Sequence, residues 1–374
     1  NFSGLEKIKF PNKIEFQLNT SISKNELFSF LEINPIIFED GIYKKLDKIL
    51  IEYEFLKNRN NPKSLIEPSV MKSGQWYRFY VENTGIHKID KDFLEDLGIN
   101  TNNLDPGKVK IYGHGGEMLP MLNSVEFPID PIENSVKFVG QNEDVFNDDD
   151  YLLFYGKGSG EFNSENNTNL NLFEDKTSYF LSISGSNGQR VSEYIEPNNS
   201  ELIIDYYTNY QFHEIDEYNL AQIGRRWFGD RFDFENTKTF EFNLENLLLD
   251  QPVNFKIYAA ATSEIPTNMS VTVNNSEIAN LYFGSIGDPI LATGSSFQSN
   301  INSQSENIDV VLNYNNSGNP SSSAYLDYIS LKGSSALSFN GSQLIFYNDD
   351  LETEAEVVTY QISNSENINS IWNI

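Results

Sequence analysis

The sequence predicts a mainly β protein with several β-rich domains, of which the last is a β-sandwich with a jelly-roll-like arrangement. After Thr237, short segments of alternating apolar and polar residues recur with turn residues between them. One clear short helix is expected, near residues 90–98. Many short strands without long helices are typical of sandwiches and related folds. The strands expected in this last part are 237–242, 253–260, 270–273, 308–314, 325–331, 343–347, 354–363 and 370–374.

The chain is long enough for more than one domain. With 374 residues, two or three domains are expected, each able to bury its own core. We expect a β-rich N-terminal segment, a central β-rich domain, an aromatic bridge and the β-sandwich domain, at residues 1–68, 69–200, 201–236 and 237–374.

The stretch from Ser73 to Gly158 has the clearest pattern. Residues 76–81 alternate between two faces, which is the period of a strand. Asp90 stands where a helix N-cap belongs, and Gly98 is placed to end the short helix that follows. Further strands are expected at 86–89, 109–112, 151–155 and 178–183, with turns at 83–85, 105–107 and 113–116 and a polar loop at 161–171.

The first 68 residues give weaker signals. Alternation of Ile14, Phe16 and Leu18 predicts a strand over residues 13–18. Ser23 is a candidate cap for a helix over residues 24–31. Two more strands, at 7–10 and 49–55, and a linker at 58–62 complete the expectations for this part.

The charge balance excludes several classes of partner. The chain has 54 acidic and 26 basic residues, a formal net charge of −28. Nucleic acid and anionic lipid would be repelled, so neither is an expected partner.

There is no cysteine, so this chain contains no thiolate nucleophile. No apolar run is long enough for a transmembrane helix, and Asn1-Phe2-Ser3-Gly4 does not begin a signal peptide, so we interpret the sequence as a mature or excised segment.

Two short motifs resemble parts of catalytic sites. Gly113-His114-Gly115-Gly116 is similar to a phosphate-binding or oxyanion loop, but it lacks the Gly-Lys-Ser/Thr ending of a P-loop. Ser159 lies between Lys157 and Glu161, where a nucleophile elbow needs glycines. We therefore favour a tight turn with positive φ for the glycine motif.

The three histidines, His87, His114 and His213, lack the spacing of a zinc motif. His213-Glu214, followed by Asp216, is open to two interpretations: an acid/base or metal site, or a buried polar network with Arg225 or Arg226 around Trp227. The network is the favoured interpretation, with Trp227 and Phe228 buried between domains and Arg225 paired to a carboxylate.

Calcium and glycans are two further candidate ligands. Glu143-Asp144 and Asp148-Asp149-Asp150 cluster near one turn. These carboxylates either bind calcium or form a solvent-exposed acidic turn without a bound ion. The 20 tyrosines would suit either a sugar-binding face or a sandwich core. No residue is assigned a catalytic, cofactor-binding or metal-binding role, and no cofactor is expected beyond this calcium alternative.

Several motifs occur in the order and spacing of a known family. They are S-G-x-W-Y, T-G-I-x-K-I, F-L-x-x-L-G-I, V-x-I-Y-G-x-G-G-x-x-L-P and D-D-Y-L-L-F-Y-G, followed by segments at 213–232 and 325–329. Together they resemble the N-terminal, non-catalytic region of PorU-type proteins, the gingipain-like cysteine peptidases that act as sortases of the type IX secretion system. The resemblance covers Ser73 to the C-terminus. The chain departs from the family pattern at two positions: Arg226 stands where an acidic residue is expected, and Asp230 replaces an expected Glu.

The resemblance implies a scaffold rather than an enzyme in this chain. A PorU-type parent would remove the C-terminal signal of its cargo and attach the cargo to anionic lipopolysaccharide, using a cysteine and a histidine in a later domain. The expected location is the extracellular face of the outer membrane. The expected partners are a PorV-type outer-membrane β-barrel, type IX cargo and a downstream catalytic domain. A stand-alone glycan-binding module is the main alternative, and a hydrolase using only carboxylates is a weaker one.

Overall fold

The computed structural model describes residues 10–23, 26–51, 69–122, 124–140, 145–163, 167–195, 202–222, 224–351 and 357–374. The chain forms two compact units, Asn1–Glu67 and Pro68–Ile374. The residues described are mainly β, with several sheets and one short α-helix, which is the helix predicted near residues 90–98. In the part of the chain described, no helix is both long and apolar enough to cross a membrane. The linker predicted at 58–62 and most of the strands predicted at 7–10 and 49–55 lie outside these residues.

The described residues of the first unit form two hairpins. Strand β1 (Phe16–Ser23) pairs antiparallel with β2 (Glu26–Ile33), and β3 (Ile36–Glu39) pairs with β4 (Ile42–Lys45). Asp40 and Gly41, which connect the second pair, both have positive φ, as a two-residue hairpin turn requires.

The helix predicted at 24–31 is wrong, because residues 26–33 form strand β2. Ser23 is the last residue of β1 rather than a helix cap. Alternation of Leu27, Ser29 and Leu31 with Phe28 and Phe30 suits a strand, and pairing with β1 supplies the backbone hydrogen bonds. Residues 49–51, at the start of another predicted strand, are irregular.

The second unit begins with a central part, residues 76–183, that has one buried core. A four-stranded sheet has the order β5-β13-β7-β8, and a three-stranded sheet has the order β6-β10-β9. Phe79, Leu94, Phe154 and Tyr179 belong to the shared core. The strands are β5 (Trp76–Val81), β6 (Gly85–Asp90), β7 (Lys110–Tyr112), β8 (Glu133–Asn134), β9 (Val136–Val139), β10 (Tyr151–Gly156) and β13 (Thr177–Ser182).

The helix of this part forms where the sequence predicts it. Helix α1 (Lys91–Asp96) has Asp90 as its N-cap, and the Asp90 carboxylate accepts a hydrogen bond from the Phe93 backbone N–H. Gly98 follows with φ of +84°, which a glycine adopts without strain. Leu94 is fully buried. Short 3-10 turns lie at Val70–Lys72, Pro106–Lys108, Asp349–Leu351 and Ser365–Asn367.

The predicted polar loop at 161–171 is instead a hairpin. Strand β11 (Gly160–Asn163) pairs antiparallel with β12 (Thr168–Leu170). We call residues 160–163 and 167–170 the junction hairpin. Its Thr168 and Asn169 are buried although both are polar. They are stabilised by contacts with a strand far along the chain, which composition alone does not reveal.

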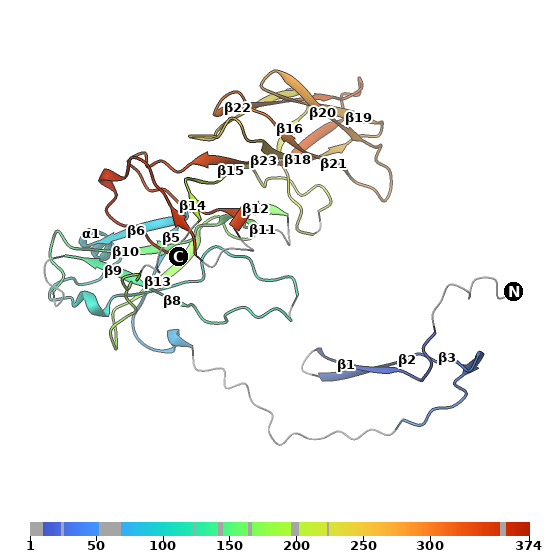
Figure 1. Ribbon diagram of the computed structural model, residues 1–374, viewed down its shortest axis with the longest axis horizontal. Coiled ribbons are helices and arrows are strands. Elements are labelled where there is room, and N and C mark those ends of the chain that lie inside the picture. Colours follow the sequence, from blue (N-terminus) through green and yellow to red (C-terminus); the bar gives the residue numbers. More distant parts are fainter. Residues whose placement is uncertain are drawn as a thin grey trace. The chain divides into compact units, whose positions relative to one another are not determined.

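The sandwich follows, and its two sheets enclose the largest core. One sheet has the order β15-β23-β18-β21, with β16 also paired to β23, and the other has the order β17-β22-β19-β20 (Figure 1). Phe255, Ile257, Val310 and Ile329 are buried in the core. The strands are β15 (Tyr206–Glu214), β16 (Gly229–Phe232), β17 (Thr237–Asn243), β18 (Val253–Thr262), β19 (Thr267–Val273), β20 (Ser276–Phe283), β21 (Thr293–Ile301), β22 (Asn307–Asn315) and β23 (Ser323–Ala336).

The C-terminal segment, red in Figure 1, runs from the sandwich back to the central part. The strands predicted at 343–347 and 370–374 are wrong, since these residues are irregular. Instead, the Gln343 side chain accepts a hydrogen bond from the Ile86 backbone N–H, and the Tyr347 carbonyl accepts one from Thr208. The strand predicted at 354–363 is reduced, in the residues described, to β24 (Thr359–Tyr360), which pairs with β14 (Ile203–Ile204).

Candidate functional site

A polar cluster joins the junction hairpin to the sandwich. Strand β15 ends at Glu214, which is 8% exposed. Its carboxylate accepts hydrogen bonds from the Thr168 hydroxyl at 2.5 Å, from the Asn169 backbone N–H at 2.7 Å and from the Asn169 side-chain amide at 2.8 Å. Tyr210, four residues before Glu214 on the same face of β15, donates a hydrogen bond from its hydroxyl to the Asn169 side-chain carbonyl. A single buried asparagine is thus held by two side chains of one strand.

Arg226 and Asp327 extend this polar cluster, and we call the whole cluster the polar junction. The Arg226 Nη1 atom lies 2.6 Å from Asp327 Oδ2, and the guanidinium also lies 4.4 Å from the centre of the Tyr258 ring. Asp327 is 3% exposed. It occupies the extra position of a β-bulge in β23, because Tyr328 pairs with Tyr258 and Leu326 with Ala259. The bulge takes Asp327 out of the apolar alternation of the strand.

The junction holds more acidic than basic side chains. Burial raises the pKa of Asp327 to about 8, with further upward contributions from Glu214 and Asp216 that oppose the effect of Arg226. Burial, and then repulsion by Glu214, raises the pKa of Asp216 to about 6. Both Asp216 carboxylate oxygens are buried, and neither has a hydrogen-bond partner among the residues described. Burial also raises the pKa of Glu214, which the donors on Thr168 and Asn169 counteract.

These contacts match the predicted network only in part. Glu214, Asp216 and Arg226 do converge, and Trp227 lies beside them. The ion pair of this junction is made by Arg226, whereas Arg225 lies 6.0 Å from the centre of the Phe173 ring. His213 is not part of the cluster.

His213 belongs to a separate contact on the edge of the sandwich. Its Nε2 atom lies 2.6 Å from Asp230 Oδ2, and its ring centre is 4.6 Å from that of Phe240. Asp230 is also 3.7 Å from the Lys238 ammonium and has φ of +27° at a bulge in β16. His213 and Lys238 lower the pKa of Asp230 against the effect of its burial.

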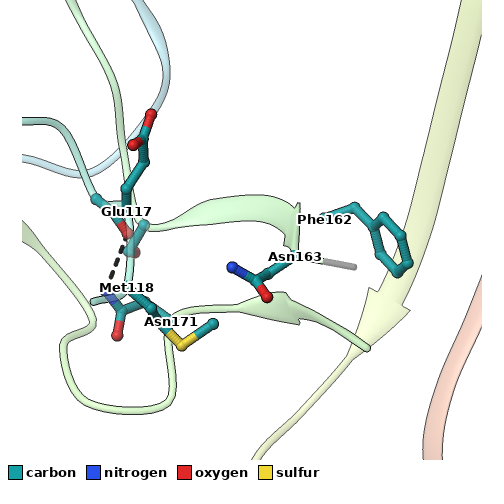
Figure 2. A pocket seen from close by; sticks show the side chains of 7 residues that line it. Glu117, Met118, Phe162, Asn163 and Asn171 are labelled. Carbon is teal, nitrogen blue, oxygen red and sulfur yellow. Dashed lines mark hydrogen bonds between the residues drawn. The ribbon is translucent and has the colours of Figure 1, made fainter. Parts of the chain in front are cut away.

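The other face of the junction hairpin lines a shallow pocket of about 220 Å³. Phe162 and Asn163 of β11 both line this pocket (Figure 2). The Phe162 ring also lies 6.4 Å from that of Tyr210, measured between ring centres. The Asn171 side chain closes one wall by donating to the Gly116 carbonyl at 2.9 Å. The remaining lining residues are Glu117, Met118 and Ser159.

The glycine motif beside this pocket forms a tightly packed turn. Gly115 has φ of +81°. A side chain at Gly116 would place its Cβ 2.1 Å from the Gly158 carbonyl oxygen. Close backbone approach therefore accounts for these glycines, and the Ser159 hydroxyl donates to the Asp175 carbonyl at 2.8 Å.

The remaining histidines and the acidic turn lie apart from the junction. The His87 ring contacts the Asn83 carbonyl at 2.8 Å, and the His114 ring packs 5.4 Å from that of Phe127. At the acidic turn, Asp148 pairs with Lys91, and Asp150 accepts hydrogen bonds from Asn147. Glu143 and Asp144 lie outside the described residues. Among those described, no group of three or more His, Cys, Asp and Glu side chains is arranged to hold a metal ion.

The sequence indicated only some of the junction residues. Thr168 and Asn169 gave no signal, because they occur in a stretch of uniformly polar residues. Asp327 did carry one, since a charged residue interrupts the apolar run Tyr325–Ile329. That interruption would have identified Asp327 as a buried, paired carboxylate.

Comparison with solved structures relates most of the chain to part of a known protein. The chain superposes on the crystal structure of dimeric latent PorU from Porphyromonas gingivalis with a TM-score of 0.61 and 22% sequence identity, covering 79% of this chain and 28% of PorU. The chain has the fold of part of PorU. It spans little more than a quarter of PorU, whose activity is therefore not transferred by this likeness alone.

The other comparisons are less informative. No protein-family model matches the chain, and no curated protein matches it in sequence. A CBM36 carbohydrate-binding module in complex with calcium and xylotriose matches with a TM-score of 0.22 at 13% identity, over 32% of this chain and 87% of that chain. The CBM36-1 domain of a xylanase from the hindgut metagenome of Trinervitermes trinervoides matches with a TM-score of 0.24 at 13% identity, over 33% and 98%. Likeness at this level supports no argument about ligands.

Proposed function

We propose that this chain is a non-catalytic scaffold of a PorU-like sortase of the type IX secretion system. The fold shared with PorU over 79% of the chain is the observation that carries the proposal. The motifs between Ser73 and Ile329 support it, because they follow the order seen in PorU-type proteins. In this proposal the parent protein removes the C-terminal signal of its cargo and attaches the cargo to anionic lipopolysaccharide.

The chemistry of the chain suits a supporting role. Cysteine-peptidase catalysis needs a thiolate, and the sequence contains no cysteine. The nucleophile and its partner histidine would therefore belong to a downstream catalytic domain. The chain would position that domain and dock a PorV-type outer-membrane β-barrel at the extracellular face of the outer membrane.

The polar junction would keep the scaffold rigid. Glu214 and Asn169 join the junction hairpin to β15 through buried hydrogen bonds. Buried polar groups depend on correct partners, so such a network favours one relative placement of the hairpin and the sandwich. A fixed placement is what a scaffold needs in order to hold a catalytic domain.

Two measurements test this function. The purified chain is incubated with a type IX cargo that retains its C-terminal signal, and the cargo mass is followed; the matched control is a PorU-like protein that includes its catalytic domain. The chain alone should leave the cargo intact, and cleavage by it would refute the non-catalytic role. In the second measurement, the immobilised chain should retain a PorV-type barrel but not an unrelated outer-membrane barrel in the same detergent. No retention, together with binding on a glycan array, would favour the stand-alone glycan-binding module.

A further inference from the structure

One loop of the central part exposes an unusual number of apolar side chains. Between β7 and β8, the side chains of Leu119, Leu122 and Ile129 are 67%, 63% and 82% exposed. Val125 and Ile132, in the same loop, are each 50% exposed. We call these five residues the apolar loop. Single exposed leucines are common on protein surfaces, but a concentration of this kind in one short stretch marks an interaction site.

The apolar loop is held at its base. Met118 is buried at one end, and at the other end the Ile132 carbonyl accepts a hydrogen bond from the Gly113 backbone N–H at 2.9 Å. Within the loop, the Asp130 carboxylate accepts a hydrogen bond from the Val70 backbone N–H at 3.1 Å. The exposure of the apolar side chains is therefore a property of an anchored segment.

Prolines restrict the backbone between these anchors. Pro120, Pro128 and Pro131 fix φ at three positions of the loop. A segment restricted in this way loses less conformational entropy when it binds, so more of the apolar contact contributes to affinity. Prolines also lack the N–H that pairing along a strand edge requires, so contact through side chains is favoured over β-augmentation.

The charge of this stretch identifies the partner's chemistry. Residues 117–133 contain Glu117, Glu126, Asp130 and Glu133 but no Lys or Arg. Glu117 pairs with Lys157 at 2.8 Å, and Asp130 and Glu133 accept hydrogen bonds from the protein's own groups, so the exposed Glu126 is the acidic side chain that the loop offers to a partner. A second copy of the chain would bring two net charges of −28 together, which is unfavourable. Anionic lipid would repel the loop for the same reason. A protein surface with an apolar hollow bordered by Lys and Arg would match both the apolar side chains and Glu126.

We propose that the apolar loop is the docking surface for such a basic-rimmed partner protein. Resting on the proposed function, this partner is the PorV-type barrel. The apolar side chains would fill the hollow, and Glu126 would face the basic rim. The inference adds the contact surface and the chemistry of the partner to the proposed docking.

A triple variant tests the apolar part of the contact. Affinity for a PorV-type barrel in detergent micelles is measured by biolayer interferometry for the wild type and for Leu119→Ser/Leu122→Ser/Ile129→Ser. The affinity should fall by roughly tenfold or more, because apolar anchors at the centre of an interface supply most of its binding energy. The matched control is Ile195→Ser/Ile290→Ser/Leu291→Ser, which replaces residues that are 89%, 53% and 54% exposed elsewhere. The single variant Leu122→Ser serves if the triple variant fails to fold, and it should still weaken binding where Leu291→Ser does not.

A charge reversal tests the rim. Glu126→Lys should slow association by about threefold to tenfold at low salt and by less at high salt, as for charges at an interface rim. An unchanged association rate at low salt would overturn the basic rim.

The outcomes separate this inference from the proposed function. If the wild type and the triple variant bind the barrel equally, the apolar loop is not the docking surface, while docking itself stands. If the wild type does not bind the barrel, both the proposed docking and this inference fail. The same variants are tested on phosphatidylglycerol vesicles and on phosphatidylcholine vesicles. Vesicle binding that the triple variant loses would overturn the protein partner in favour of a lipid surface.

Discussion

Strand β23 passes through both the sandwich core and the polar junction. Ile329 and Leu331 belong to the apolar core, whereas Asp327 lies at a bulge and pairs with Arg226. In the core, each side chain is replaceable by another of similar size and polarity, because apolar contact has no direction. In the junction, each group needs a particular partner, because a buried carboxylate without one is costly. The same strand therefore combines a region that tolerates conservative substitution with a region that does not.

The largest loss of stability is expected in the core. Phe255 is fully buried in the sandwich, and Phe255→Ala should lower the free energy of unfolding by about 3–5 kcal/mol. Since no charge is involved, the loss should be the same at pH 5 and pH 8. Urea unfolding at the two pH values measures it. A loss that depends strongly on pH would break the contrast between core and junction.

Removing the central carboxylate of the junction should come next. Glu214→Ala leaves the Thr168 hydroxyl and two donors of Asn169 without their acceptor. The expected loss is roughly 2–4 kcal/mol, from unsatisfied buried polar groups. Hydrogen exchange should show that residues 167–170 lose protection while β18 keeps it. The matched control is Glu217→Ala, an exposed glutamate nearby, which should change neither quantity. Uniform loss of protection would mean that the junction has no local role.

The sequence predicted the core far better than the junction. Alternating apolar residues located β17, β18 and β22, because a strand of this kind buries one face whatever its partner is. The nearly continuous apolar run at 325–331 located β23, which is buried on both faces there. The sequence did not indicate β20, β21 or the junction hairpin, and polar residues predominate in β21 and in the hairpin. The burial of Thr168 and Asn169 depends on Glu214, about 45 residues away in sequence, and no local pattern encodes such a contact.

The helix predicted at 24–31 shows a related limit. Ser23 is of a residue type that often caps helices, but residues 26–33 pair with β1, and this pairing supplies their backbone hydrogen bonds in a strand instead. By contrast, Asp90 caps α1 as predicted, since the cap and the apolar face of that helix agree. For the candidate site, sequence indicated Glu214, Asp216 and Arg226 as a network, but it did not indicate Asn169 or the pairing with Asp327.

The unpaired carboxylate of the junction predicts a dependence on pH. The pKa of Asp216 is about 6 in the folded protein, above its ordinary value of 3.8. The folded state therefore holds this proton more tightly, and the associated stability, present below pH 4, is lost as the pH rises toward 6. Asp216→Asn should leave stability at pH 4 unchanged and raise it at pH 8 by about 1–2 kcal/mol, less than the full shift implies because the residue is only partly buried. Urea unfolding at both pH values checks this, and equal effects at pH 4 and pH 8 would contradict it.

The smallest effect is expected at Trp227, beside the junction. The sequence predicted that Trp227 and Phe228 are both buried, but only Phe228 is, at 5% exposure, while Trp227 is partly exposed. Phe228 packs with Ala260 and Tyr325, so Phe228→Ala should cost about 3 kcal/mol. Trp227→Ala removes fewer buried contacts and should cost about 1 kcal/mol. Thermal and urea unfolding of the two variants give the comparison directly. If Trp227→Ala costs as much as Phe228→Ala, Trp227 stabilises the Arg226–Asp327 pair beyond its own apolar contact, and the junction extends to the surface of the protein.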